Sequence, residues 1–306
     1  MDRADDADTG ARARGRVERI GDVRYGAAGG LPLTLDLYRP QAPPEGAMPA
    51  LVWLHGGAWA FGEKETVPRL LRTLAGRGFV VASVGYRLTG QATFPAQIHD
   101  AKAAVRWLRA NAQAYGLDPG RIGAAGHSAG GHLAALLGTS GGAPELEGDS
   151  GSPGHASRVQ AAVPIAAPVD ALRWGAPAAP PGEWPWEWLV GGPLRERAGL
   201  VRMANPLTYV TPGAPPFLIV HGVEDETVPV GQSDLLADAL RAAGVAVTYL
   251  RVAGGRHHFR QAIAPAEEQD AGYWPRVIHD LLPADLEAQV VRFLEGHLAH
   301  APRVVP

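Results

Sequence analysis

Ser128 lies in the pentapeptide Gly126-His127-Ser128-Ala129-Gly130, between an apolar run and a stretch of helical character. The pentapeptide fits G-x-S-x-G, the pattern of a strained strand-to-helix turn that lifts a serine oxygen above a sheet. Small residues are needed on both sides of the serine because larger side chains would collide with the neighbouring strand or helix. Free N–H groups at the start of the helix favour negative charge beside the serine. The pattern therefore predicts a nucleophilic serine.

A serine hydroxyl becomes a good nucleophile when a base removes its proton and a carboxylate supports that base. Asp225 follows the apolar run FLIVHG, and His257 and His258 follow the next apolar run. The order Ser, Asp, His along the chain is that of one class of serine hydrolases. Glu224 and Glu226 flank the aspartate, but their side chains are expected to project differently from a tight turn. Chemistry alone leaves the choice between the two histidines open.

A pocket for a developing oxyanion is indicated by WLHGGAWAFG, which follows another apolar run. Gly56 and Gly57 allow the backbone to turn and to point its amides at the serine. The amide of Ala129 adds a further donor. Such preorganised N–H groups stabilise the negative oxygen that forms when a carbonyl is attacked.

Composition and motifs exclude several other kinds of chemistry. The chain has 28 Lys and Arg, 31 Asp and Glu, a net charge of −3 and no cysteine. This balance argues against nucleic acid or a membrane surface as a partner, and cysteine chemistry is excluded. His127 and His132 lack the spacing of a zinc-binding helix, and Glu63 stands where a phosphate loop requires lysine, so no metal and no cofactor are predicted. The expected partner is a small molecule, and the oligomeric state, a homodimer included, stays open.

Alternating strands and helices are expected to position these groups. Strands are predicted at residues 33–40, 50–57, 79–87, 121–126, 159–167, 216–222 and 245–252. Apolar residues recur at helical spacing over 95–116 and over 233–244, where Gly244 favours a helix end. Strands that are apolar on both faces and separated by helices indicate a mostly parallel central sheet flanked by helices on both faces. The predicted fold class is α/β.

The chain of 306 residues, 46% of them hydrophobic, is long enough for a sizeable core. We predict one domain over residues 17–306, after a charged tail at 1–16 that has too few apolar groups to be ordered. Excursions at 170–205 and 261–283 interrupt the alternation and are typical of a small cap or lid. With neither a signal peptide nor an apolar run long enough to cross a membrane, a cytoplasmic protein is expected.

Aromatic and imidazole side chains near these motifs are the candidates for substrate contact. Apolar ligand sites are lined mostly by such groups. The predicted substrate-binding residues are Trp59, Tyr86, His127, Trp188 and His258.

Together these motifs resemble the α/β-hydrolase superfamily, in particular the esterases related to hormone-sensitive lipase and, within them, the feruloyl/acetylxylan esterase-like group. The resemblance runs from about residue 16 to residue 298 and rests on HGGAWAFG, on the long block around GHSAGG, on NPLTYV, on PPFLIVHGVEDETVP and on GGRHHF. It implies an α/β-hydrolase fold. It also implies Ser128 as nucleophile, Asp225 as acid and His257 as base, because His257 aligns with the histidine of the usual His-Gly-Phe.

The same resemblance implies an oxyanion hole formed by the amides of Gly57, Ala58 and Ala129. It implies a serine carboxylesterase that cleaves small acyl or aromatic acid esters through an acyl-enzyme. An arylformamidase of the kynurenine formamidase type, which also has H-G-G-x-W, is the alternative enzyme. A hydrolase-fold protein that binds its ligand without turnover is the alternative from another class. Arg256 and His258 depart from the family pattern, in which both positions are usually glycine.

Overall fold

The computed structural model describes residues 16–174, 182–259 and 281–299. Within them eight strands form one sheet in the order β1-β2-β4-β3-β5-β6-β7-β8. The strands are β1 Val17–Ala28, β2 Leu31–Pro40, β3 Met48–Leu54, β4 Val80–Val84, β5 Leu117–His127, β6 Ala161–Ile165, β7 Phe217–Gly222 and β8 Val247–Val252. The β1–β2 and β2–β4 pairs are antiparallel and the others are parallel. The predicted mostly parallel sheet is confirmed.

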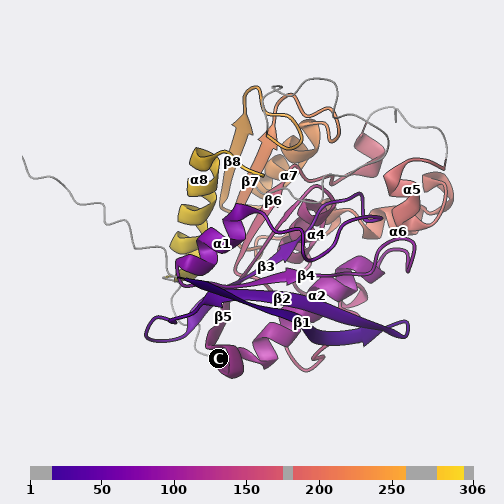
Figure 1. Cartoon of the computed structure of the whole chain (residues 1–306). Helices are drawn as coiled ribbons and strands as arrows, with labels where there is room; N and C mark the ends of the chain where they lie inside the picture. Colours follow the sequence, from indigo (N-terminus) through magenta and orange to yellow (C-terminus); the bar gives the residue numbers. More distant parts are fainter. Residues whose placement is uncertain (1–15, 175–181, 260–280, 300–306) are drawn as a thin grey trace, which may run out of the picture.

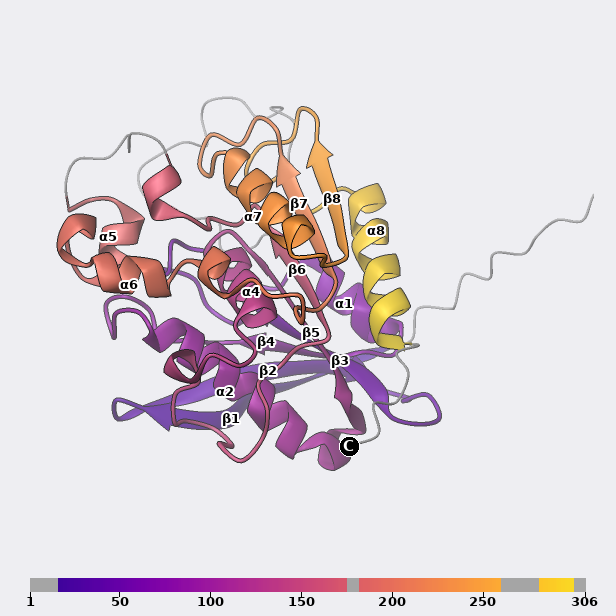
Figure 2. The ribbon, with the colours of Figure 1, turned by 180° about the vertical axis from the view of Figure 1, so that it is seen from behind.

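Helices cover both faces of this sheet, as predicted (Figure 1). They are α1 Arg69–Gly76, α2 Ala96–Ala110, α3 Ala112–Tyr115, α4 Ala129–Thr139, α5 Pro185–Val190, α6 Ala198–Met203, α7 Gly231–Ala242 and α8 Ala284–Leu294. Buried side chains of α1 and α8 pack on one face, and those of α2, α4 and α7 pack on the other. The view from behind shows the same two layers (Figure 2).

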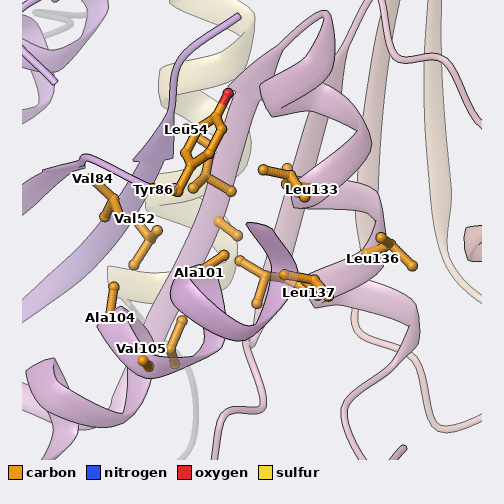
Figure 3. Close-up of a cluster of buried hydrophobic side chains, with 14 of the residues drawn as sticks. Val52, Leu54, Val84, Tyr86, Ala101, Ala104, Val105, Leu133, Leu136 and Leu137 are labelled. Carbon is orange, nitrogen blue, oxygen red and sulfur yellow. The ribbon is translucent and has the colours of Figure 1, made fainter. Parts of the chain in front are cut away.

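Alternate residues of β3 serve the two layers, because successive side chains of a strand point to opposite faces. Leu51 and Trp53 pack in the cluster of α1 and α8. Val52 and Leu54 pack in the cluster of α2 and α4, where they meet leucine and alanine side chains of those helices (Figure 3). Both faces of β3 are therefore buried from solvent. This packing fixes the carboxyl end of the strand, beside which the serine turn lies.

The sequence predicted no strand over residues 17–28, and the structure corrects this. β1 pairs with β2 at one edge of the sheet, and of its side chains Tyr25 alone is buried. An edge strand is held by backbone hydrogen bonds and has a largely exposed surface, so its sequence lacks the apolar pattern of the inner strands.

The helix predicted over 95–116 is divided into α2 and α3. At Asn111 the backbone leaves the helical conformation, with φ −103° and ψ 16°, and its N–H and side-chain amide both donate to the carbonyl of Trp107, at 3.0 and 2.8 Å. Gly116 then ends α3 with a left-handed φ of 65°. The helix predicted over 233–244 is α7, and Gly244 follows its end, also with a positive φ.

The excursion at 170–205 contains the short helices α5 and α6 beside single 3₁₀ turns. Its start is tied to α7, because the side chain of Gln232 accepts from the amides of Val169 and Asp170 at 2.8 and 2.7 Å. Its role as a cap or lid stays a prediction. The predicted tail at 1–16 and the excursion at 261–283 lie almost wholly outside the described residues. In the part of the chain that the structure describes, no helix is long and apolar enough to span a membrane.

Glu147 neutralises two cations that α2 buries. The side chains of Lys102 and Arg106 are 0% and 2% exposed, and each contacts the Glu147 carboxylate, at 2.7 and 2.8 Å. We expect Glu147→Gln to lower the free energy of unfolding by about 3 kcal/mol, because it leaves buried positive charge without an anion. Urea unfolding measures this. Asp149→Asn, at an exposed carboxylate of the same loop, is the control and should change stability by less than about 0.5 kcal/mol; equal effects of the two would contradict the assignment.

Candidate active site

Ser128 stands alone between β5 and α4, with φ 55° and ψ −120°. A left-handed φ in a residue other than glycine is strained by about 1–3 kcal/mol and is common at functional sites. A Cβ on Gly126 would lie 2.3 Å from the carbonyl oxygen of Gly130, and one on Gly130 would lie 2.0 Å from that of Leu54. The backbone thus approaches itself so closely that glycine is required on both sides of the serine, as the motif predicted.

A hydrogen-bonded chain joins Ser128 to two distant side chains. Its Oγ lies 3.0 Å from Nε2 of His257, and Nδ1 of His257 lies 2.7 Å from Oδ2 of Asp225. The three residues follow β5, β8 and β7, and the carboxyl ends of these parallel strands lie along one edge of the sheet. His257 and Asp225 are 6% and 8% exposed, so the hydrogen bond between these two side chains is shielded from water. Serine, imidazole and carboxylate are in the arrangement of a base-activated nucleophile.

The Asp225 carboxylate is held on both of its oxygens. Oδ1 accepts from the amides of Thr227 and Val228, at 2.9 and 2.8 Å. Oδ2 accepts from His257 and also lies 3.2 Å from Nε2 of His221. Burial raises the pKa of Asp225, but hydrogen bonds from His221, His257 and the Val228 amide outweigh burial, so that this pKa lies well below its usual range. The carboxylate is therefore anionic at any pH at which an enzyme works.

The structure places the rival acids and the rival base elsewhere. Glu224 and Glu226 are exposed, and Glu226 faces Arg256 at 3.6 Å. The half-buried ring of His258 packs against the rings of His127 and His257, each with a centroid separation of 5.1 Å. His257, not His258, is hydrogen-bonded to the serine.

The turn at 56–59 passes directly beside the serine. A Cβ on Gly56 would lie 3.3 Å from the Cβ of Ser128. Gly57, Ala58 and Trp59 all have a positive φ, and the carbonyl of Gly57 accepts from the amide of Phe61 at 2.9 Å, which closes the turn. The predicted oxyanion donors, the amides of Gly57, Ala58 and Ala129, thus belong to two segments that meet at Ser128. Their action on substrate stays a prediction.

Trp59 lies beneath this turn rather than at its surface. Its side chain is 2% exposed and donates from Nε1 to Nδ1 of His132 at 3.2 Å, while Nε2 of His132 donates to the carbonyl of Ala204 at 2.6 Å. Burial lowers the pKa of His132 to about 4, so the ring is neutral and can accept this hydrogen bond. The structure does not favour the expected substrate contact of Trp59, because an indole ring in the core, packed against Trp186, is out of reach.

Of the other predicted substrate contacts, two are buried like Trp59 and two are more exposed. Tyr86 and His127 are 5% and 2% exposed. Tyr86 donates from its hydroxyl to the carbonyl of His55, and His127 contacts the carbonyl of His257 from Nε2, each at 2.8 Å. Both support neighbouring backbone, and neither is placed to contact a substrate. Trp188 is half-buried and stands edge-on to the exposed ring of Phe61, so Trp188 and His258 remain predictions for the pocket.

Sequence reasoning gave no role to His221 and weighed His132 only as a metal ligand; the structure places His221 beside Asp225 and His132 one turn after Ser128. For His221 a signal was present, because it is a histidine inside an apolar strand four residues before the acid.

A described group of three acidic residues, Asp22, Asp36 and Glu65, has the spacing of a cation site. Its centre is taken by the ammonium group of Lys64, which lies 2.8 Å from Asp22 and 3.1 Å from Asp36.

Comparisons with known proteins identify the family of the chain. The sequence profile of the BD-FAE family matches residues 35–240. Esterase LipQ of Mycobacterium tuberculosis is 36% identical over 248 residues, which cover 78% of this chain and 56% of LipQ. Isoprenylcysteine alpha-carbonyl methylesterase ICME of Arabidopsis thaliana is 30% identical over 73% of this chain and 53% of its own length. The chain spans about half the length of the curated relatives it matches.

Solved structures extend the likeness to nearly the whole chain. A truncated carbohydrate esterase from gut microbiota superposes with a TM-score of 0.78 and 28% identity over 92% of this chain and 97% of its own. Esterase Est2 of Thermogutta terrifontis superposes with a TM-score of 0.70 and 27% identity over 96% of each chain. The resemblance inferred from the motifs is therefore confirmed.

Proposed function

Because this chain belongs to the BD-FAE family of α/β-hydrolases, we propose that it is a serine carboxylesterase that hydrolyses small acyl or aromatic acid esters. The observation that carries the proposal is the unbroken contact from Ser128 through His257 to Asp225, at 3.0 and 2.7 Å. Its relatives LipQ and ICME are named as esterases, and that supports ester rather than amide bonds as the target.

In the proposed reaction Ser128 Oγ attacks the ester carbonyl while Nε2 of His257 takes the hydroxyl proton. The carbonyl oxygen becomes negative and is stabilised by the amides of Gly57, Ala58 and Ala129. His257 then gives its proton to the departing alcohol, and an acyl-enzyme remains on Ser128. Asp225 stays ionised throughout and supports the imidazolium that forms in each step.

Deacylation repeats these steps with water as the nucleophile. His257 takes a proton from water, which attacks the acyl carbonyl, and the tetrahedral oxyanion is held by the same amides. His257 returns the proton to Ser128 Oγ as the acid leaves. Each group thus acts twice, and this chemistry requires no redox step or group carrier.

The pH profile is expected to have one acidic limb, because the imidazole of the base accepts a proton only when it is neutral. Asp225 does not contribute to this limb, since its pKa is held well below its usual range. Burial likewise lowers the pKa of His127 and of His132, so both stay neutral. Measurement of kcat/KM from pH 5 to pH 9, corrected for spontaneous hydrolysis, tests this; a profile that is flat down to pH 5 would argue against an imidazole base.

Parallel assays on p-nitrophenyl acetate and N-formylkynurenine test the substrate class. An ester hydrolase should turn over the acetate ester at least about tenfold more efficiently than the formyl amide, a difference of about 1.4 kcal/mol in transition-state stabilisation. The reverse preference would assign the chain as an arylformamidase. A fluorophosphonate probe that leaves Ser128 unlabelled would indicate a protein that binds its ligand without turnover.

We also propose that the natural substrate is a small ester present in the cytoplasm. A panel of esters that varies acyl length and alcohol group would rank the substrates, and fractionation of cells would locate the protein. Recovery of the protein outside the cell would refute the cytoplasmic location without touching the reaction.

A further inference from the structure

We propose that His221 is a positioning residue that aims the Asp225 carboxylate at His257, an inference that rests on the proposed hydrolase function. His221 is the last residue but one of β7 and is 0% exposed. A buried imidazole costs free energy unless its nitrogens are hydrogen-bonded, so its partners explain why a histidine stands in an apolar strand. Nδ1 lies 2.6 Å from Oγ of Ser233, and Nε2 lies 2.9 Å from the carbonyl oxygen of Val228.

The partners of the ring identify its tautomer. Nε2 faces the carbonyl of Val228 and, at 3.2 Å, Oδ2 of Asp225. Both oxygens can only accept a hydrogen bond, because the Asp225 carboxyl is ionised, so Nε2 carries the hydrogen. Nδ1 then accepts from the hydroxyl of Ser233, in the first turn of α7. The helix thereby fixes Nε2 as the protonated nitrogen, which donates to the carbonyl of Val228 at 2.9 Å and lies 3.2 Å from Oδ2 of the acid.

The same nitrogen lies beside the carboxylate. Oδ1 accepts from two backbone amides, whereas Oδ2 accepts from His257 and has Nε2 of His221 at 3.2 Å. Without His221, Oδ2 would be held by the very residue that it has to orient. The buried carbonyl of Val228 would also lose its donor, and the carboxylate, held less firmly at Oδ2, could turn about its Oδ1 anchors.

A turned carboxylate supports the His257 imidazolium less well. The transition state contains that imidazolium, so kcat should fall. The same loss makes protonation of the free enzyme harder, so the acidic limb of kcat/KM should move to lower pH. Among the residues that the structure describes, the other titratable groups whose rings contact His257 are His127, from the end of β5, and His258, from the same loop, and neither is altered in the test.

The test compares His221→Phe, which fills the space without a donor, with His221→Gln, whose side-chain amide can reach the same oxygens. On p-nitrophenyl acetate, His221→Phe should lower kcat about tenfold with KM within about twofold of wild type, and shift the acidic limb down by about half a pH unit. His221→Gln should retain kcat within about threefold of wild type. The matched control is Leu236→Ala, a buried α7 residue packed in the same layer, which should lower Tm and leave the limb in place.

An acidic limb that His221→Phe leaves unmoved or shifts upward would overturn the proposal, as would a glutamine variant as impaired as the phenylalanine variant. If His221→Phe does not fold, ¹⁵N NMR of the wild-type imidazoles decides: Nε2 of His221 should be protonated and Nδ1 unprotonated, as the partners of the ring require, and the opposite tautomer refutes the inference. This measurement needs no turnover. A wild-type protein that hydrolyses no ester would therefore refute the proposed function separately.

Discussion

Ser128→Ala should lower kcat on p-nitrophenyl acetate by about 10⁴-fold or more, because the substitution removes the atom that forms the acyl-enzyme. Removal of the hydroxyl group should leave the fold intact. Alanine keeps the Cβ and takes the same left-handed φ of 55° with similar strain, and the backbone contacts of the elbow do not involve Oγ. The amide of residue 128 still donates to the carbonyl of Ile165 at 2.9 Å. Thermal unfolding should therefore shift by no more than about 2 °C.

Ser140→Ala is the matched control, at the other end of α4. Ser140 is also buried, and its Oγ donates to the carbonyl of Leu136 at 2.6 Å, so its loss affects stability but not turnover. A fluorophosphonate probe should label wild type and Ser140→Ala and fail to label Ser128→Ala. Residual activity of Ser128→Ala close to wild type would remove the nucleophile from the proposed reaction.

His257→Ala should lower kcat by about 10⁴-fold, whereas His258→Ala should change it by less than about fivefold. The two histidines are adjacent, yet His257 alone bridges Ser128 and Asp225, at 3.0 and 2.7 Å. Removal of its ring takes away the base and leaves the buried carboxylate facing an empty space. Removal of the His258 ring takes away packing against His127 and leaves the relay in place.

The measurement is kcat at saturating substrate for both variants, with circular dichroism to show equal folding. The double variant should be no worse than His257→Ala, because residues that act as one unit are not additive. Comparable losses in the two single variants would mean that the His258 ring moves into the role of the base or holds His257 in place. A larger loss in His258→Ala would reverse the assignment.

The inner strands and the main helices followed from periodicity, since burial on both faces leaves an apolar run in the sequence. β1 did not, because an exposed edge strand is held by backbone hydrogen bonds that any sequence can make. The break at Asn111 was missed as well. There the backbone of Asn111 leaves helical φ and ψ while its side-chain amide shares the carbonyl of Trp107 with the backbone N–H, a local event that the apolar pattern does not record.

In the candidate site, too, some features were predicted correctly from the sequence and others were not. Glycines that flank Ser128 were predicted because the elbow needs them, and the close backbone contacts of Gly126 and Gly130 account for that need. The five aromatic and imidazole substrate contacts were predicted from residue type and from closeness to the motifs. Neither says whether a ring is buried, and Trp59, Tyr86 and His127 are buried.

The sequence by itself predicted the chemistry and the order serine, aspartate, histidine along the chain, because the elbow and the strand ends are local patterns. Chemistry left His257 and His258 open and the resemblance implied His257; the tertiary structure hydrogen-bonds His257 to the serine and brings His221 beside the acid. Both depend on distances between segments, which are set by the packing of β5, β7, β8 and α7. Hydrogen bonds are sensitive to such distances, whereas the pattern of apolar residues is not.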